Sequence, residues 1–221
     1  MKTVIISCQT IENELRQAMA DCHCDYPVRY VESGLHDVPQ KLHDAMQQLL
    51  DECQDYDRSL VAMGFCGNAL ADLQTGRLEL IIPRADDCIT LLLGSAAARA
   101  EWNQKIAAFF MTEGWLKGER NIWREYQYAI EKYGEETGRA IYEMMFHHYQ
   151  AIALLDTGSY DLTPAITETQ FIARELGLEH QVIPASVEFI RRLLSGPWPE
   201  EAFVCIPPGQ SVAVGDLTLR L

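Results

Sequence analysis

The sequence has little positive charge. Eighteen Lys and Arg residues oppose 32 Asp and Glu residues, giving a formal net charge of -14, and no run of basic residues exceeds the pair Arg191–Arg192. Nucleic acids and anionic membranes are bound through basic surfaces. The charge balance therefore argues against both as partners and favours a small molecule or a metal centre.

Long apolar runs and an even cysteine set are also lacking. The apolar run Val4–Ile6 is too short for a secretory signal, and the windows Ile89–Leu93 and Ile152–Leu155 are far short of a membrane span. Seven cysteines are an odd number, which does not suggest a disulfide framework. We therefore expect a cytoplasmic protein with no membrane partner.

What is present indicates a packed core. Apolar residues make up 48% of the chain and charged residues 23%, as in ordinary globular proteins. Short apolar runs near 3–6, 28–31, 59–63 and 78–82 each end in a loop, and helical patterns follow most of them. This alternation is typical of a mostly parallel sheet.

The alternation stops and then returns. Residues 96–150 contain aromatic-rich helical patterns, and residues 151–206 repeat the strand–loop–helix order of residues 3–63. The pattern predicts an α/β fold with two pseudo-repeated Rossmann-like lobes and a helical insertion between them. The expected limits are 1–95, 96–150 and 151–221, with a binding cleft at the carboxyl ends of the strands.

Thiols and one imidazole follow the first four strands. The residues are Cys8, His36, Cys66 and Cys88. Parallel strands bring their carboxyl ends to one edge, so these side chains are expected to converge. Three thiols and one imidazole suit zinc or an iron–sulfur cluster. The alternative is that the cysteines are simply buried and His36 caps a helix.

The loops around these residues offer further candidates. Gly64 and Gly67 let the backbone approach a ligand closely, and we place Asn68 and Arg84 with them as cofactor-binding residues. Cys88 falls in the first turn of a helix, where free amides favour thiolate.

Two aspartates are candidates for catalysis. Asp87 either caps the helix that begins at Cys88 or takes part in catalysis. Asp156, at a strand end, is a candidate general base. The tripeptide Asp156–Gly158 matches that of aspartic proteases, but a helix follows it, which argues against a protease.

Other cysteines and histidines are expected to be structural. Cys22–Cys24 is interpreted as a solvated helix end, and Cys53 and Cys205 as structural residues. His147 and His148 lie on an aromatic helix, where an interhelical contact is favoured over a place in the cleft; their role stays open.

Several blocks resemble a known family. Gly64–Asn68 and Pro83–Cys88, followed by Gly94-Ser95, resemble family 1638 of domains of unknown function, found in methanogens and other anaerobes. Leu35-His36, Gly114-Trp115 and the Cys8 and Asp156 loops extend the resemblance over nearly the whole chain.

The resemblance implies a setting but no reaction. Family members are often encoded near corrinoid-dependent methyltransferases, which implies one-carbon metabolism, a corrinoid cofactor and a corrinoid methyltransferase component as partner. The chain departs from the family where Phe65 replaces a frequent Tyr and where Ala96–Ala98 replaces an aromatic.

Three functions follow as hypotheses. The leading one is a metal- or iron–sulfur-binding protein with Cys8, His36, Cys66 and Cys88 as ligands. The second is a metal-free thiol enzyme of the racemase type, although its second lobe lacks the matching thiol. The third is a non-enzymatic binder of an anionic small molecule or corrinoid. Whether the protein is an enzyme stays open.

Overall fold

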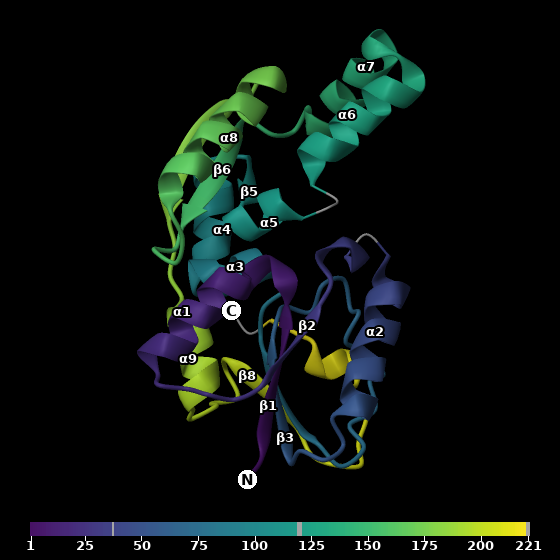
Figure 1. Ribbon diagram of the computed structural model, residues 1–221, viewed down its shortest axis with the longest axis vertical. Coiled ribbons are helices and arrows are strands. Elements are labelled where there is room, and N and C mark those ends of the chain that lie inside the picture. The colour runs from purple at the N-terminus through teal and green to yellow at the C-terminus, as the bar shows by residue number, and fades with distance from the viewer. Residues whose placement is uncertain (37, 119–120, 220–221) are drawn as a thin grey trace.

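The computed structural model describes residues 1–36, 38–118 and 121–219 and has two lobes, each built on a sheet (Figure 1). The first sheet has the order β2-β1-β3-β4-β8 and the second the order β5-β6-β7. The strands are β1 (Thr3–Cys8), β2 (Val28–Val31), β3 (Arg58–Ala62), β4 (Glu79–Pro83), β5 (Ala108–Met111), β6 (Ala151–Asp156), β7 (Glu179–Pro184) and β8 (Phe203–Ile206).

Helices cover the sheets and connect the lobes. Those of residues 1–107 and 185–219 are η1 (Gln9–Ile11), α1 (Glu12–Asp21), η2 (Ser33–Leu35), α2 (Pro39–Glu52), α3 (Cys88–Leu93), α4 (Ala96–Lys105), α9 (Glu188–Ser195) and η3 (Val214–Asp216). Those of residues 108–184 are α5 (Glu113–Lys117), α6 (Ile122–Tyr133), α7 (Glu135–Phe146) and α8 (Leu162–Glu175). The α6–α7 hairpin projects from the second lobe (Figure 1).

The predicted α/β class with mostly parallel sheets is confirmed. β1 pairs in parallel with β2 and β3, β3 with β4, and β6 with both β5 and β7. All six residues of β1 are buried, as expected for a strand covered on both faces. The carboxyl ends of β1–β4 therefore share one edge of the first sheet.

Two strands differ from the sequence-based pattern. The segment expected to close the second lobe, 202–206, forms β8, which runs antiparallel to β4 in the first sheet. β8 joins the first sheet because α9, which precedes it, packs against α1, α3 and β3 of the first lobe. The chain therefore leaves α9 near the open edge of the sheet at β4. The region expected to be helical, 96–150, also contains β5. Its apolar run Ala108–Met111 is too short for periodicity to separate strand from helix.

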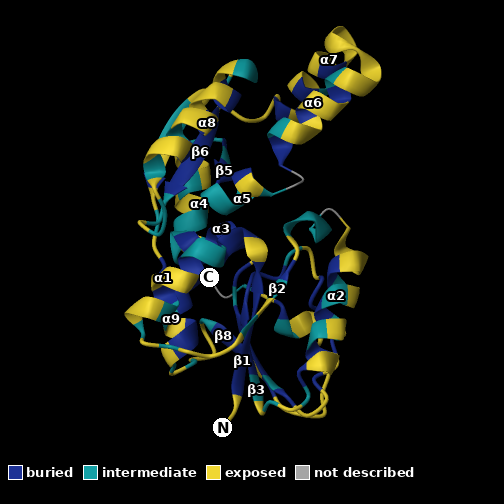
Figure 2. Cartoon of the chain, viewed as in Figure 1, coloured by how far each residue is buried: buried dark blue, intermediate teal, exposed yellow. Residues whose placement is uncertain are grey.

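Burial follows the sheets. Figure 2 shows buried residues concentrated in the strands and exposed residues on the outward faces of α2, α7 and α8. The largest core surrounds the first sheet, and a second core joins β5 and β6 to α6, α7 and α8. In the part of the chain that the structure describes, no helix is both long and apolar enough to cross a bilayer.

Candidate functional site

Cys8 lies at the end of β1 with no exposed surface. Its Sγ is 3.5 Å from Nε2 of His36 and 2.8 Å from Oγ1 of Thr10. The predicted proximity of Cys8 and His36 is therefore present, and Thr10, two residues further along the chain, is an additional polar contact of the thiol.

The His36 ring is oriented by the backbone of η2. Its Nδ1 is 2.9 Å from the carbonyl oxygen of Ser33. Because a carbonyl can only accept, Nδ1 carries the proton and the lone pair of Nε2 faces Cys8. A histidine whose second nitrogen donates to a carbonyl is held as metal-ligating histidines are.

Cys88 links Cys8 to Cys66. The Cys88 thiol interacts with those of Cys66 and Cys8, so the three sulfurs follow one another in a row, and Cys88 is 6% exposed. The contact with Cys66, together with burial, raises the pKa of Cys88. The contact with Cys88 and burial likewise raise the pKa of Cys8, against the opposing effect of His36. Both thiols therefore stay protonated unless a cation replaces their protons.

The loop that carries Cys66 has a constrained backbone. Cys66, Gly67 and Asn68 all have positive φ, at 47°, 68° and 66°. Such a run costs free energy for the two residues with a side chain and marks a loop held by its surroundings. The amide of Cys66 donates to the carbonyl of Asp86 at 2.8 Å, which ties this loop to the start of α3.

Gly64 allows that close approach. A Cβ at Gly64 would lie 2.5 Å from Cα of Asp87, so no larger residue fits without moving the loops apart. Gly64, which was expected to let the backbone approach a ligand, instead lies against the backbone of Asp87. A Cβ at Gly67 would lie 3.9 Å from Cγ of Pro39, an ordinary contact, and the carbonyl of Asn68 accepts from the amide of Ala71.

The four predicted ligands form a row rather than a closed shell. The contacts run from His36 to Cys8, then to Cys88 and Cys66. Among the described residues, no three Cys, His, Asp or Glu side chains are arranged to hold one metal ion as they stand. An ion shared by all four would therefore require their side chains to turn toward a common point.

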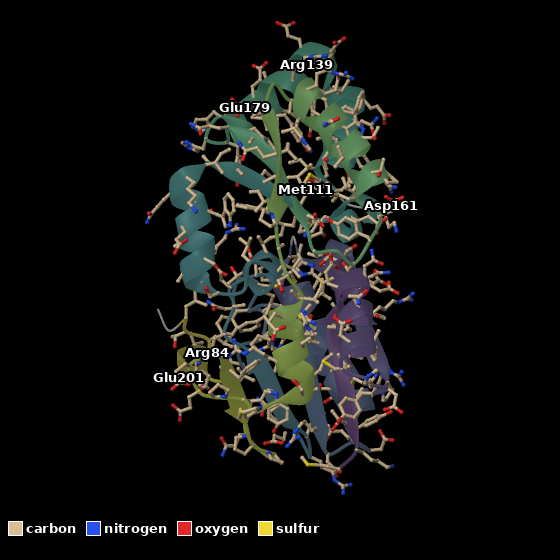
Figure 3. The ribbon with its side chains drawn as sticks, turned by 90° about the vertical axis from the view of Figure 1, so that its left-hand side faces the viewer. Arg84, Met111, Arg139, Asp161, Glu179 and Glu201 are labelled. Atoms are coloured by element: carbon tan, nitrogen blue, oxygen red, sulfur yellow. The ribbon has the colours of Figure 1, made fainter. Side chains whose placement is uncertain are left out.

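Arg84 does not join this group. Its guanidinium donates to the carbonyls of Glu200, Asp216 and Thr218 at 2.7–2.9 Å, and so holds the C-terminal segment. Figure 3 shows it in the lobe that carries β8, well away from Met111 at the end of β5. The structure gives Arg84 a structural contact where the sequence predicted a ligand-binding one.

The two candidate catalytic aspartates make local contacts. Asp87 caps α3, because its side chain accepts from the amide of Thr90 at 2.7 Å, and it also lies 3.8 Å from Arg99. Oδ1 of Asp156 accepts from the amide of Gly158 at 3.1 Å within its own turn.

A buried acid that sequence reasoning missed lies between the lobes. Glu14 of α1 has no exposed surface, and Oε1 accepts from the Thr157 hydroxyl at 3.2 Å. Burial raises the pKa of Glu14, and Oε2 has no partner among the described residues. The signal was available, because Glu14 lies between Ile11 and Leu15 on the apolar face of its helix.

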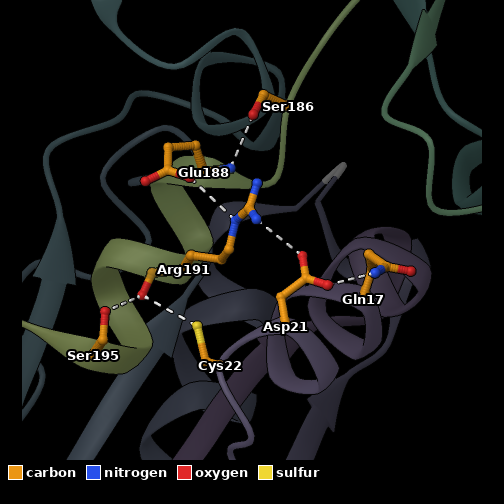
Figure 4. A network of polar contacts seen from close by, with 7 residues as sticks. All are labelled: Gln17, Asp21, Cys22, Ser186, Glu188, Arg191 and Ser195. Atoms are coloured by element: carbon orange, nitrogen blue, oxygen red, sulfur yellow. Dashed lines mark hydrogen bonds and ion pairs between the residues drawn. The ribbon is translucent and has the colours of Figure 1, made fainter.

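The remaining thiols lie apart from the site. Cys22, at the end of α1, donates to the carbonyl of Arg191 at 3.9 Å, within the α1–α9 network of Figure 4. Arg191 also pairs with Asp21 at 3.1 Å. Cys53 is buried and Cys205 is exposed on β8.

The two adjacent histidines are exposed at the end of α7. Nδ1 of His147 lies 2.6 Å from the carbonyl of Met144, and the two rings are 3.4 Å apart. Neither His147 nor His148 is among the residues that line the cleft described next.

A polar cleft opens beside Cys8 and His36. It has a volume of about 870 Å³ and lies where α5 faces α1 and the loop that precedes α2. Its lining residues are Gln9, Glu12, Asn13, Arg16, Glu32, Ser33, Gly34, Leu35, Val38, Lys41, Gly114, Lys117 and Gly118. Of the described residues of the second lobe, those of α5 and the glycine after it line the cleft.

Two glycines let α5 pack closely against the segments that contain Thr10 and Ser33. A Cβ at Gly114 would lie 2.0 Å from the carbonyl oxygen of Thr10, and one at Gly118 would lie 3.3 Å from Oγ of Ser33. The same Thr10 and Ser33 contact Cys8 and His36. The second lobe therefore packs directly on the segments that hold the thiol and the imidazole.

Fold and site together define a two-lobed α/β protein with a thiol–imidazole group at the strand ends of one lobe. The chain belongs to the family described as "Protein of unknown function (DUF1638)", whose model matches residues 30–194. This confirms the resemblance seen in the sequence. No curated protein and no solved structure matches the chain.

Proposed function

We propose that this protein binds a single thiophilic metal ion, zinc in the first place, through Cys8, His36, Cys66 and Cys88. The observation that carries the proposal is the His36 geometry. Nδ1 is held by the Ser33 carbonyl while Nε2 lies 3.5 Å from Cys8 Sγ. Zinc bonded tetrahedrally to one sulfur and one nitrogen separates those two atoms by about 3.5–3.6 Å.

The thiol contacts favour one ion over a cluster. The Cys88 thiol interacts with the thiols of both Cys8 and Cys66. In a four-iron, four-sulfur cluster each thiolate binds a different iron, which places the ligand sulfurs farther apart. Such a cluster is therefore the less favoured form of the same proposal.

The ion would take the place of two buried protons. Cys8 and Cys88 have raised pKa values because they are buried against other thiols. A divalent cation stabilises thiolates at such a site and releases their protons. With all four ligands engaged the site would be structural; exchange of partly exposed Cys66 for a substrate would open a Lewis-acid position.

A cytoplasmic setting is part of the proposal. All seven cysteines are free thiols, which suits a reducing compartment. A corrinoid cofactor, a corrinoid methyltransferase partner and a role in one-carbon metabolism stay predictions from the family resemblance.

The second candidate is a metal-free thiol enzyme. Cys8 and His36 have the arrangement of a nucleophile and its base, because the S–H can donate to Nε2. A reactive cysteine, however, needs a lowered pKa and an accessible sulfur, whereas Cys8 is fully buried and its pKa is raised. This favours the metal site.

Elemental analysis of anaerobically purified protein tests the proposal. We expect about one zinc per chain, and a loss of most of it in Cys66→Ser and in His36→Gln. The matched controls are Cys205→Ser and His180→Gln, whose side chains lie outside the row of thiols.

The possible outcomes separate the candidates. Detection of iron and acid-labile sulfide in place of zinc would indicate an iron–sulfur cluster at these residues. Less than about 0.2 metal per chain after reconstitution, or full metal retention in Cys66→Ser, would overturn the proposal.

A further inference from the structure

The cleft beside Cys8 and His36 brings together three cationic side chains from three elements. Arg16 comes from α1, Lys41 from α2 and Lys117 from α5. The chain as a whole has a net charge of -14, so such a group is unusual on its surface. The volume of the cleft, about 870 Å³, is in the range of small-molecule sites.

The three cations differ in how far they are already neutralised. Arg16 pairs with Glu12 at 2.5 Å and Lys117 with Glu113 at 2.9 Å. Lys41 forms no ion pair with any of the described carboxylates. Among the described residues that line the cleft, the acids are Glu12 and Glu32, and Glu113, which pairs with Lys117, lies beside them. An incoming anion would therefore meet Lys41, whose ammonium group has no ion pair with the described residues, and two cations whose exposed ion pairs exchange readily.

The lining is otherwise polar and rich in backbone. Only Leu35 and Val38 contribute large apolar side chains, while Gly34, Gly114 and Gly118 leave the main chain open to the cleft. An apolar ligand would leave these polar groups without partners. A ligand with several oxygen atoms would satisfy them.

The cleft and the thiol–imidazole site share their walls. Ser33 lines the cleft and its carbonyl accepts from His36, while Gln9 lines it directly after Cys8. A molecule seated among the three cations thus lies beside Gln9 and Leu35, the chain neighbours of Cys8 and His36.

We infer that the cleft binds a small molecule with at least two anionic oxygen groups, phosphate or carboxylate, held between Lys41 of the first lobe and Lys117 of the second. The placement of this molecule next to a metal ion rests on the proposed function. Its binding does not, because neither lysine is a metal ligand.

Equilibrium dialysis with radiolabelled probes tests the inference. The probes are inorganic pyrophosphate for phosphates and citrate for carboxylates, each used with the purified, reduced protein. We expect saturable binding of at least one of them, weakened about tenfold by Lys41→Gln and by Lys117→Gln, since each change removes one charge-assisted contact. Lys132→Gln, on the exposed face of α6, is the matched control and is expected to bind as the wild type does.

Each result decides something. Binding of pyrophosphate alone assigns a phosphate ligand, and binding of citrate alone a carboxylate. No binding of either at about 10 mM, tenfold above a millimolar Kd, or equal binding by Lys41→Gln and wild type, overturns the inference. Binding that persists in Cys66→Ser after its metal is lost supports the anion site independently of the metal site. If anion binding is lost together with the metal, the probe was binding to the metal ion itself, and the inference is overturned.

Discussion

The two lobes have the same parallel core but different strand ends. In the first lobe, β1 ends at Cys8, and His36, Cys66 and Cys88 follow the next three strands. In the second lobe, the residues that follow the strands use hydroxyl and carboxyl groups to cap helices and turns, as Thr112 and Ser186 do. A shared topology therefore positions a reactive group in one lobe and a supporting wall in the other, and function follows from the residues at the strand ends.

Backbone strain shows the same division. The non-glycine residues with positive φ in the described chain are His23, Cys66, Asn68 and Asp72, all in the first lobe. Two of them flank Gly67 in the loop that presents a thiol. Strained residues persist where their surroundings determine them, which is common at functional sites.

The largest effect is expected where α5 of the second lobe packs on the first lobe. Gly114→Ala places a methyl group against the Thr10 carbonyl, so we expect urea unfolding to show a loss of about 3 kcal/mol. Gly215→Ala, where a Cβ meets nothing within 4 Å, is the control and should cost little. Because all four proposed ligands belong to the first lobe, the folded Gly114→Ala protein should still retain zinc. Loss of zinc would mean that the second lobe is needed to form the site.

A smaller effect is expected at Glu14, which joins α1 to the Thr157 loop. Burial raises its folded pKa above the unfolded value, so the fold favours the protonated form. Stability is then full below the unfolded pKa and is lost as the pH rises through the folded pKa. Glu14→Gln should remove this loss and gain about 1 kcal/mol at pH 8, as measured by urea unfolding across pH. Exposed Glu168→Gln is the control, and a wild-type pH slope in Glu14→Gln would contradict the assignment.

The smallest effect is expected at two helix caps, one in each lobe. Asp87 caps α3 in the first lobe and Asp161 caps α8 in the second. Replacing either by Ala should lower the free energy of unfolding by about 1 kcal/mol. Only Asp87→Ala is expected to weaken zinc binding as well, severalfold in a chelator competition, because α3 begins at Cys88. Equal zinc affinities in the two variants would count against the role of α3.

The sequence predicted the parts of the fold that depend on local pattern. The buried runs before Cys8 and Asp156 were recognised as strands because each is continuous, apolar and ended by a polar loop. The convergence of Cys8 and His36 followed from parallel strand order alone.

The rest depends on tertiary contacts that no local pattern contains. The pairing of β8 with β4 is decided by where α9 packs, and the contacts of Arg84 with three carbonyls depend on the same returning segment. The cleft and its three cations arise from the approach of α5 to α1, which Gly114 permits.

The return of β8 to the first sheet also sets an order of assembly during synthesis. The second sheet is complete once residue 184 has left the ribosome, because its strands are contiguous in the chain. The first sheet lacks its edge strand until residues 203–206 follow. Since domains generally fold as units while the chain emerges, the later-starting lobe has all its strands first. The half with the thiols carries an open edge at β4 through most of translation, and the nascent protein is most exposed to aggregation in that interval.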